Sequence, residues 1–489
     1  MIPAATPATD QDRRFASLVR RAVIWRSGSQ ILAQAVQWAA TFLVIRILEP
    51  ADYGLFAMTQ VVLVLLNMLN GYGLASGLIR RPEVSEREIR QLFGMLVLLN
   101  GALALAQLLS APLVAGYYRH PELVPLLRVQ ALLYLSTPFA ALAFALLSRR
   151  MEYRGQAWAN IVGSIASAAT ALGGALAGWG VWTLVFAPMA LFGVRAVLLT
   201  VAARSLVRPS FDFRGAGHLA AYGGVMALGQ LFWFAQTQAD VFIAGRGLGA
   251  HLLGIYTTAL FLAQIFVSKV VPPLNEVAFS AYARLQDGEE GALGRGWLHA
   301  VLVVMAAGLP FHLGLAATAE PLVLAMLGPK WAEVVPVVRL LAFAMPFMTL
   351  LVLIGPACEA RGRPGITVLN GAVGAALLVG GFLLGAPHGP TGLAVAWVVA
   401  YPPYLAFALW RGLPVIGVRP RALLGAVLPA LGAALAMWAL VVVADAALPS
   451  LTPLARLGVL VAIGAGAYAG WLYAWARPTW RALAAVVRR

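Results

Sequence analysis

The chain has 489 residues, of which 61% are apolar and 11% charged, with a mean hydropathy of +0.83 and a formal net charge of +16. Soluble domains carry roughly 25% charged residues, so this composition excludes a soluble protein and indicates a membrane protein. The basic residues stand in short breaks between long apolar runs and form no cluster interleaved with aromatics, which excludes nucleic acid as a partner. The single cysteine, Cys358, excludes an intramolecular disulfide.

Residues 1–21 are polar and contain no apolar run, so they predict a cytoplasmic tail and not a cleavable signal peptide. A helix needs about 20 apolar residues to cross a bilayer core of roughly 30 Å. The apolar runs that follow predict fourteen spans, in chain order 22–45, 55–79, 92–116, 124–147, 157–178, 181–203, 219–244, 254–279, 297–320, 334–358, 366–386, 391–410, 423–444 and 456–475. Only Trp179-Gly180 separates the fifth span from the sixth, so a count of twelve or thirteen stays open.

The spans group into an all-α integral membrane protein with two lobes of six helices each. The expected lobes are residues 22–203 and 219–410, joined by a cytoplasmic linker at 204–218. Residues 411–475 would form a C-terminal helix pair, and residues 476–489 a cytoplasmic tail.

An internal repeat supports two lobes that cross the membrane in the same direction. Residues Gln30–Phe56 align with Gln230–Tyr256 without a gap, at an offset of 200. The identities are Gln30/Gln230, Ala35/Ala235, Ala39/Ala239, Phe42/Phe242, Arg46/Arg246, Leu48/Leu248 and Gly54/Gly254. Parallel repeats are one of the standard builds of secondary transporters, with the substrate site at the repeat interface.

The basic residues orient the spans. With a cytoplasmic N-terminus, inside segments hold 26 of the 35 lysines and arginines, outside segments hold five, and four fall within spans. This bias is what the positive-inside rule expects. Both termini are therefore predicted to be cytoplasmic.

No motif for catalysis, a cofactor or a metal is found. The chain has no phosphate-binding GxxxxGK[ST] loop, its six histidines lack ligand spacing, and no segment outside the predicted spans is long enough for a soluble catalytic domain. The one enzyme-like feature is the acidic pair Glu49 and Asp52 on the first outside turn, since membrane glycosyltransferases can use an acidic residue there. The alternative is an ordinary polar turn before Tyr53-Gly54.

Several segments, in this order, resemble those of polysaccharide-repeat (Wzx-type) oligosaccharide flippases. The run Arg46-Ile-Leu-Glu-Pro-Ala-Asp-Tyr-Gly resembles that family's R-x-L-x-P-x-x-[FY]-G signature after the first span. The other matching segments are Gly73–Arg81, Arg149–Arg154, Asp240–Arg246 with Leu253–Tyr256, and Glu359–Pro364. The resemblance covers roughly residues 20–410; Ser280 stands where many members have proline, and the last two spans carry no matching motif.

The resemblance implies a fold of the multidrug/oligosaccharidyl-lipid/polysaccharide (MOP) exporter type. It also implies that the protein flips undecaprenyl-diphosphate-linked oligosaccharide repeat units across a bacterial inner membrane by alternating access. The implied partners are the lipid bilayer, the lipid-linked oligosaccharide, and the polymerase and export proteins of the polysaccharide. The alternatives are an ion-coupled multidrug antiporter of the same fold, a membrane glycosyltransferase or polymerase, and a scaffold in an export complex.

Intramembrane cations are the first candidates for a phosphate site, because the planar guanidinium binds phosphate bidentately and charges in a membrane usually face the bundle interior or water. At a rise of about 1.5 Å per residue, Arg195 lies about 13 Å from the cytoplasmic boundary and Lys269 about 22 Å from the outer one. Arg128 and Arg339 fall in the outer third, where snorkelling to the headgroups is the alternative. Arg26 would mark the cytoplasmic mouth of the path or anchor the helix to headgroups.

Four further charged residues are candidates for coupling or gating. Asp240 lies about 9 Å inside the outer end of its span, where it could bind a coupling proton or cation, or pair with an arginine of the other lobe. Glu276 follows Lys269 by seven residues, which places both on one face of a continuous helix. Arg46 and Arg246 occupy matching positions of the repeat near the outer boundary.

Overall fold

The computed structural model describes residues 28, 30, 32–69, 84–213, 217–285, 291–449 and 451–487. Within these ranges it does not describe the side chains of 217–231, 276–277, 280, 283–285, 482 and 485–487. Throughout this described part the regular elements are helices, and no strand occurs in it. The chain divides into two compact units: unit 1 comprises residues 1–48 and 58–230, and unit 2 comprises 49–57 and 231–489.

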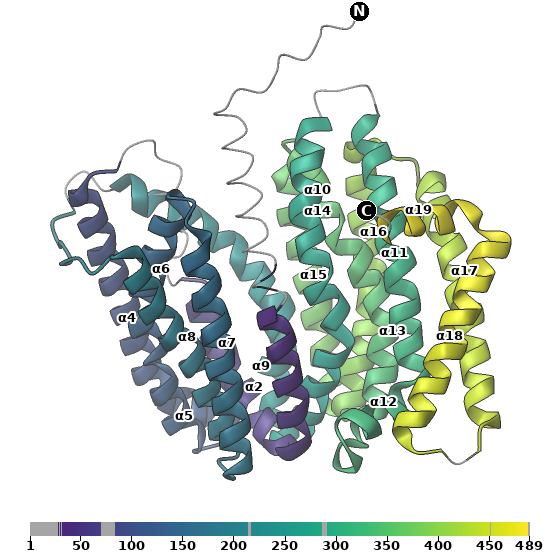
Figure 1. Cartoon of the computed structure of the whole chain (residues 1–489), viewed down its shortest axis with the longest axis horizontal. Coiled ribbons are helices and arrows are strands. Elements are labelled where there is room, and N and C mark those ends of the chain that lie inside the picture. Colours follow the sequence, from purple (N-terminus) through teal and green to yellow (C-terminus); the bar gives the residue numbers. More distant parts are fainter. Residues whose placement is uncertain are drawn as a thin grey trace, which may run out of the picture. The chain divides into compact units, whose positions relative to one another are not determined.

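Unit 1 is a bundle of apolar helices. Its elements are the first helix Leu32–Ile47, α2 (Pro50–Asn67, whose first residues belong to unit 2), α4 (Glu86–Tyr118), α5 (Leu123–Gln130), α6 (Leu133–Arg149), α7 (Tyr153–Leu176) and α8 (Val181–Ala203) (Figure 1). Helix α7 packs along α8, and α6 packs on α8 and α4.

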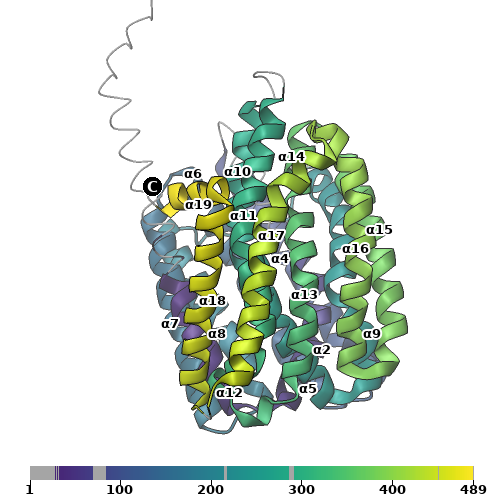
Figure 2. The same ribbon diagram turned by 90° about the vertical axis from the view of Figure 1, so that its right-hand side faces the viewer.

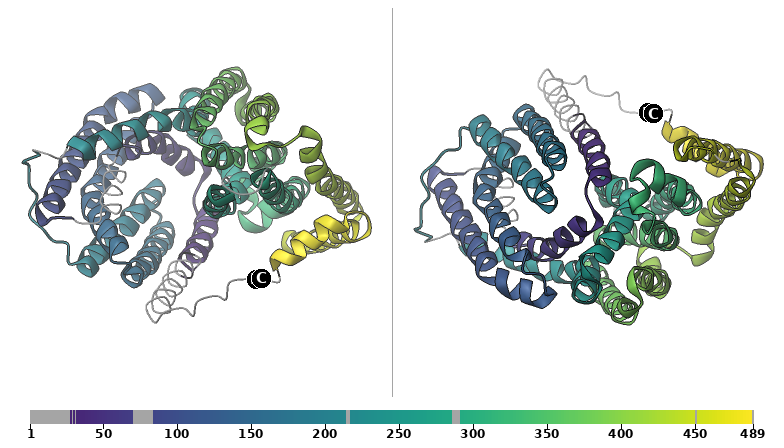
Figure 3. Two further views of the ribbon diagram at one scale, coloured as in Figure 1. Left: turned by 90° about the horizontal axis from the view of Figure 1, so that it is seen from above. Right: turned by 90° about the horizontal axis from the view of Figure 1, so that it is seen from below.

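Unit 2 is larger and contains the C-terminal pair. Its elements are most of α9 (Gly217–Lys269), α10 (Val271–Leu285), α11 (Ala292–Ala317), α12 (Ala319–Met326), η1 (Pro329–Trp331), α13 (Val334–Val352), α14 (Ile354–Ala360), α15 (Pro364–Gly385), η2 (Ala386–His388), α16 (Gly389–Ile416), α17 (Pro420–Ala447), α18 (Pro453–Trp475) and α19 (Arg477–Val487). Viewed along the helices, each unit is a bundle of roughly parallel helices (Figure 3).

Eleven helical segments of the described chain are long and apolar enough to cross a membrane. Two of them, Phe232–Asn275 and Pro364–Ile416, each contain two crossings, and a shorter apolar helix covers Leu32–Ile47. Counted in this way, the described residues supply the fourteen crossings that the sequence predicts. The fifth and sixth are separate helices because the turn between α7 and α8 contains Gly178 and Gly180, both at positive φ, which only glycine adopts readily.

The seventh and eighth spans join without the loop predicted at 245–253. Helical structure continues through this region and is interrupted only at Gly249, with φ 70° and ψ 168°. In a continuous helix Asp240 and Tyr256 would be about 24 Å apart, yet the Tyr256 hydroxyl lies 2.7 Å from the Asp240 carboxylate. The chain therefore reverses at Gly249.

The eighth span is broken, which corrects the continuous helix expected at 254–279. Helix α9 ends at Lys269 and α10 begins at Val271, and Pro272 and Pro273 occupy the first turn of α10. Proline is tolerated in a first turn but lacks the amide that a continuing helix requires. The break also removes the regular spacing from which a common face for Lys269 and Glu276 was predicted.

The first half of the predicted linker is bound to unit 1. Residues 205–213 have no regular secondary structure and run beside the start of α4, where the Ser210 amide donates to the Arg90 carbonyl at 2.9 Å. The Arg90 side chain donates to the Arg208 carbonyl at 3.2 Å, and Arg87 pairs with Asp212 at 2.9 Å. The linker is thus held to α4 by both main-chain and side-chain bonds.

The repeat appears in unit 2 as a contact between two glycines. A Cβ atom on Gly54 would overlap the carbonyl of Ala250, and one on Gly254 would overlap the carbonyl of Pro50. Positions 54 and 254, like 50 and 250, correspond in the repeat, so the same contact is made twice with the copies exchanged. Such reciprocity is the signature of a two-fold relation, here an approximate one within a single chain.

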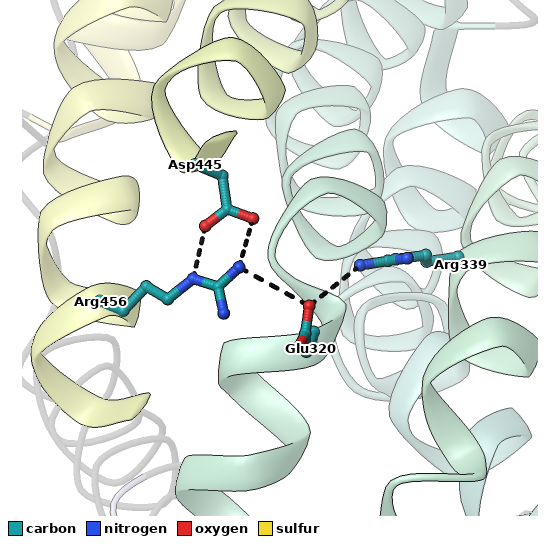
Figure 4. Close-up of polar contacts among 4 residues, drawn as sticks. All are labelled: Glu320, Arg339, Asp445 and Arg456. Carbon is teal, nitrogen blue, oxygen red and sulfur yellow. Dashed lines mark hydrogen bonds and ion pairs between the residues drawn. The ribbon is translucent and has the colours of Figure 1, made fainter. Parts of the chain in front are cut away.

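The C-terminal helices α17 and α18 run side by side and are joined to the rest of unit 2 by an ionic network (Figures 2 and 4). Arg456 at the start of α18 pairs with both oxygens of Asp445 on α17, at 2.6 and 2.8 Å. Glu320 on α12 lies 3.6 Å from Arg456 and 3.6 Å from Arg339 on α13. Two cations and two anions from four helices therefore balance one another.

Replacing Arg456 with glutamine is expected to destabilise this junction, because it leaves the largely buried Asp445 carboxylate without its bidentate partner. Hydrogen bonds to charged groups are worth about 1.5–3 kcal/mol, and we expect a loss in that range, read as a lower midpoint of thermal unfolding of the purified protein. The control is Arg339→Gln, which removes one 3.6 Å contact of a half-exposed side chain and should cost less than about 1 kcal/mol. Equal losses from the two variants would contradict this account of the network.

The last described residues form the helix α19, where the sequence analysis expected only a tail. It packs against α11 and α18, with Thr479 buried and Trp480 edge-on to Tyr473. Arg477 and Arg481 are exposed. This mixed face of arginine and aromatic side chains suits a membrane–water interface.

Candidate functional site

A polar cavity of about 300 Å³ lies within unit 1, between the first helix, α6, α7 and α8. The first helix contributes Gln30, Gln34 and Gln37 to its lining. Residues spaced by four and three positions lie on one face of a helix, so these three amides form a single stripe. Polar side chains are costly in a transmembrane helix unless they face the bundle interior, and this stripe faces a cavity.

Helix α7 supplies a second polar stripe on the opposite wall. Tyr153, Gln156, Asn160 and Ser164 follow one another at intervals of three and four residues and all line the cavity. The Gln156 amide nitrogen donates to the hydroxyl of Ser148 on α6 at 2.9 Å. That bond fixes the orientation of Gln156 and connects the wall to α6.

Among the described residues that line the cavity, Arg195 on α8 is the only charged one. No ion pair or hydrogen bond joins its guanidinium to another described residue. Its stem packs against α7, where a Cβ atom on Gly163 would lie 2.8 Å from the Arg195 Cγ and 3.2 Å from the Leu191 carbonyl oxygen. The absence of a side chain at Gly163 therefore makes room for Arg195.

These groups define what the cavity can bind. Amide and hydroxyl groups both donate and accept hydrogen bonds, which suits a ligand rich in hydroxyl groups. A guanidinium without a carboxylate partner suits a phosphate oxygen pair. A charge in the membrane costs at least about 2.5 kcal/mol, so Arg195, which no described residue neutralises, is the candidate in this cavity for binding an anionic group.

The sequence analysis identified Arg195 but missed the amides around it. Their signal was the spacing of Gln30, Gln34 and Gln37 within one span and of Gln156, Asn160 and Ser164 within another. Either stripe alone fits a helix–helix contact, because polar side chains often bond across transmembrane helices. Only the packing of the two helices shows that the stripes share a cavity.

The other predicted cations lie elsewhere. Arg128 is exposed in the last turn of α5, and Lys269 is exposed at the break between α9 and α10. Arg339 is paired with Glu320 at 3.6 Å. None of the three lines the cavity of unit 1, and their roles as phosphate ligands stay predictions.

Four further candidates can be placed only in part. Arg26 and the side chain of Glu276 lie outside the described residues. Arg46 ends the first helix and Arg246 lies in α9, both with exposed side chains. Gating by this arginine pair stays a prediction.

Asp240 is fully buried within unit 2 and belongs to a chain of hydrogen bonds. The Trp397 indole donates to the Tyr256 hydroxyl at 2.7 Å, and that hydroxyl donates to the Asp240 carboxylate at 2.7 Å. The second Asp240 oxygen accepts the Val241 amide at 2.8 Å. This chain ties both halves of α9 to α16; coupling through Asp240, or its pairing with an arginine of the other lobe, stays a prediction.

The two acids of the first outside turn have structural partners within unit 2. Glu49 pairs with Lys330 at 3.1 Å, and the Asp52 carboxylate accepts the Glu49 amide at 3.1 Å at the start of α2. Next to them Tyr53 stands edge-on to Trp331. These contacts account for both carboxylates without a catalytic role.

The fold defines the class of protein. The lipid II flippase MurJ, in an inward closed conformation, superposes with a TM-score of 0.76 at 12% identity, covering 93% of this chain and 99% of that one. An inward-facing MATE multidrug resistance transporter of the MOP superfamily superposes with a TM-score of 0.62 at 15% identity, covering 81% and 98%. The chain thus has the helical membrane-protein fold that these two transporters share.

The sequence then gives the family. The profile of the polysaccharide biosynthesis protein family matches residues 43–336, so the chain belongs to that family. The teichuronic acid biosynthesis protein TuaB of Bacillus subtilis is 26% identical, over 70% of this chain and 71% of that one. The succinoglycan biosynthesis transport protein ExoT of Rhizobium meliloti is 26% identical, over 78% and 77%.

Proposed function

We propose that this transporter flips undecaprenyl-diphosphate-linked oligosaccharide repeat units from the cytoplasmic to the outer leaflet of a bacterial inner membrane. The observation that carries the proposal is Arg195, the one cation among the described residues that line an amide-rich cavity in a protein with the MOP fold. A lipid-linked glycan combines phosphate, sugar hydroxyls and an apolar tail. The cavity offers complementary groups to the first two, while the tail can remain in the bilayer.

The proposed mechanism is alternating access. The halves that would move are the lobes predicted at 22–203 and 219–410, joined by the linker predicted at 204–218. Flipping moves the polar headgroup past the bilayer core, where every unsatisfied polar group costs several kcal/mol. Hydrogen bonds from the cavity to the headgroup would replace those of water during this passage.

The orientation proposed is that predicted by the arginine bias, with both termini in the cytoplasm. The tails 1–21 and 476–489 then lie inside, and the C-terminal pair 411–475 adds two further spans. The proposed partners are the bilayer, the lipid-linked oligosaccharide, and the polymerase and export proteins that act after flipping.

The same fold also supports a second candidate, an ion-coupled multidrug antiporter. Such a protein would be expected to place carboxylates in its cavity to bind cationic drugs, whereas the described residues that line the cavity of unit 1 include Arg195 and no acid. A glycosyltransferase is less well supported, because Glu49 and Asp52 already have structural partners.

Deleting the gene tests the proposal. We expect the repeat unit to be assembled on its lipid but to remain in the inner leaflet, with surface polysaccharide lost. The measurement is the accessibility of the lipid-linked unit to an enzyme or lectin added outside the inner membrane, with total lipid-linked unit as the control. Loss of the lipid-linked unit itself would favour the glycosyltransferase, and an unchanged distribution would favour the antiporter.

A further inference from the structure

The fourth span of unit 1 is broken between α5 and α6 (Figure 1). The Leu132 amide donates to the Val129 carbonyl at 3.1 Å and the Tyr134 amide to the Ala131 carbonyl at 3.2 Å, three residues back instead of four. Ala131 and Leu132 keep right-handed helical torsions, with φ −58° and −62°. The chain therefore tightens into a 3₁₀ turn and continues in the same direction.

A proline weakens the same stretch further. Pro138 lies inside α6, and it has no amide hydrogen to donate to the Tyr134 carbonyl four residues back. The Leu135 amide again bonds three residues back, to the Leu132 carbonyl at 3.1 Å. Residues 131–138 thus lack the regular bonding of a helix, and helices bend where that bonding is interrupted.

Three polar side chains surround this break. Gln107 on α4 donates to the Leu127 carbonyl at 2.8 Å, and Gln130 at the end of α5 donates to the Thr59 hydroxyl of α2 at 2.9 Å. Tyr134 is the third, and the side chains of Gln107, Gln130 and Tyr134 are at most 1% exposed. The Oε1 atoms of both glutamines and the Tyr134 hydroxyl have no hydrogen-bond partner among the described residues.

These three oxygens approach one another at the break. Leu127, Gln130 and Tyr134 follow at intervals of three and four residues, which places them on one face of the span. Gln107 reaches this face from α4 through its bond to Leu127. Tyr134 packs against Leu103, one turn before Gln107 on α4. Helical side chains lean toward the start of their own helix, so Tyr134 leans toward Gln130.

The depth of the break makes a partner for these oxygens necessary. Gln107 lies eleven residues before Tyr118, the last residue of α4. That is about 16 Å along the helix, near the middle of a bilayer core of roughly 30 Å. Lipid cannot bond to polar groups at this depth, and ordered water is one of the means by which broken transmembrane helices satisfy them.

The groups present fit a water molecule. Water can donate to the Oε1 atoms of Gln107 and Gln130 and accept the hydroxyl proton of Tyr134, which gives the three bonds typical of a buried water. A bare cation would fit the oxygens, but it would bring a charge to side chains that carry none, and a buried charge without a counter-charge is unfavourable.

We propose that a water molecule bound by Gln107, Gln130 and Tyr134 completes the hydrogen bonding at the break, and that residues 131–138 are the joint at which α5 bends on α6 during transport. The bending rests on the proposed function, whereas the water site does not. Bonds made through water and side chains can be re-formed as the helix bends, because they do not require the fixed spacing of a main-chain ladder.

Variants that lose one tyrosine hydroxyl and keep the ring test the water. In lipid nanodiscs, Tyr134→Phe should lower the unfolding midpoint of the full-length protein as much as Tyr468→Phe, whose hydroxyl donates to the Ala306 carbonyl at 2.6 Å. Tyr473→Phe alters an exposed residue and should leave the midpoint unchanged. Removing a buried hydroxyl that has no partner is neutral or stabilising, so an unchanged or higher midpoint for Tyr134→Phe would refute the bound water.

The choice of salt separates water from a cation. The same unfolding is measured in sodium, potassium and choline chloride at equal ionic strength. We expect Tyr134→Phe to lower the midpoint equally in all three salts. A midpoint that sodium or potassium raises in the unaltered protein, but not in Tyr134→Phe, would replace the water with a monovalent cation.

Pro138→Ala tests the joint, because alanine supplies the amide that can bond to the Tyr134 carbonyl. The variant should unfold at a higher midpoint and yet lower transport several-fold, measured as surface polysaccharide in a deletion strain at matched abundance. The matched control is Pro429→Ala, which alters a proline inside α17 and should leave transport unchanged.

The possible results for Pro138→Ala decide the joint separately from the water. Full transport at a raised midpoint, or a midpoint that does not rise, would overturn the joint, and so would an equal loss of transport from Pro429→Ala. The unfolding measurements need no substrate. They therefore decide the water site whatever the gene deletion shows about flipping.

Discussion

Substituting alanine for Gly254 is expected to prevent most of the protein from accumulating in a folded form. The added methyl group would overlap the Pro50 carbonyl, and a main chain cannot move aside as a side chain can. Overpacking typically costs about 1–3 kcal/mol and occasionally more, and a main-chain contact places this substitution at the upper end. The repeat predicts the same outcome for Gly54→Ala, whose methyl group would overlap the Ala250 carbonyl.

The measurement is the amount of monodisperse protein extracted from membranes, together with its unfolding midpoint. Gly247→Ala is the control, because it lies in the same helix, α9, with no atom within 4 Å of an added Cβ. Alanine has the higher helix propensity by about 1 kcal/mol, so this variant should be at least as stable as the unaltered protein. Normal accumulation of both Gly54→Ala and Gly254→Ala would show that the glycine contact is not required.

Arg195→Ala is expected to abolish most transport while the protein still inserts and accumulates. The substitution removes an intramembrane charge whose insertion costs at least about 2.5 kcal/mol, so folding should be unimpaired. Transport should fall at least ten-fold, because the cavity of unit 1 loses the one cation that its described lining contains. Arg195→Lys should retain part of the activity, since lysine keeps the charge but not the bidentate geometry.

A second variant tests the position of the guanidinium without removing it. Gly163→Ala would bring a methyl group within 2.8 Å of the Arg195 Cγ and should shift the side chain, lowering transport by less than Arg195→Ala does. The control is Gly173→Ala on the same helix, where an added Cβ meets no atom within 4 Å. Transport is measured as surface polysaccharide in a deletion strain at matched abundance. Full activity of Arg195→Ala would refute the cationic site.

The helices could be predicted from the sequence because a membrane requires each crossing to be a long apolar run. The exact residues at which one helix ends and the next begins could not be predicted. The chain reverses at Gly249 within residues that remain helical on both sides, so no polar loop marks the turn. The break after Lys269 has a local signal in Pro272 and Pro273, but prolines also occur inside continuous helices such as α11, which contains Pro310.

Of the residues that line the cavity, the sequence analysis predicted only the cation, Arg195. Depth along a helix follows from residue counting, and this identified Arg195. Whether a charge faces a cavity or a partner depends on neighbouring helices, as Arg339 shows by pairing with Glu320, which lies on α12. The amide side chains carry no net charge, so a search of the sequence for intramembrane charges does not find them, although they make up most of the polar lining.

The reciprocal contact between Gly54 and Gly254 has a consequence for how the two halves of the chain can change. The contact is made between main-chain atoms. It therefore requires glycine at positions 54 and 254 and places no requirement on side chains elsewhere. The residues on the inner faces of the two bundles can differ from one another without disturbing this contact, provided that these two glycines remain. The cavity around Arg195 belongs to unit 1, while in unit 2 the Tyr404 hydroxyl donates to Gln236 at 3.1 Å. A repeat whose copies meet through two main-chain contacts therefore leaves each half free to acquire its own polar groups.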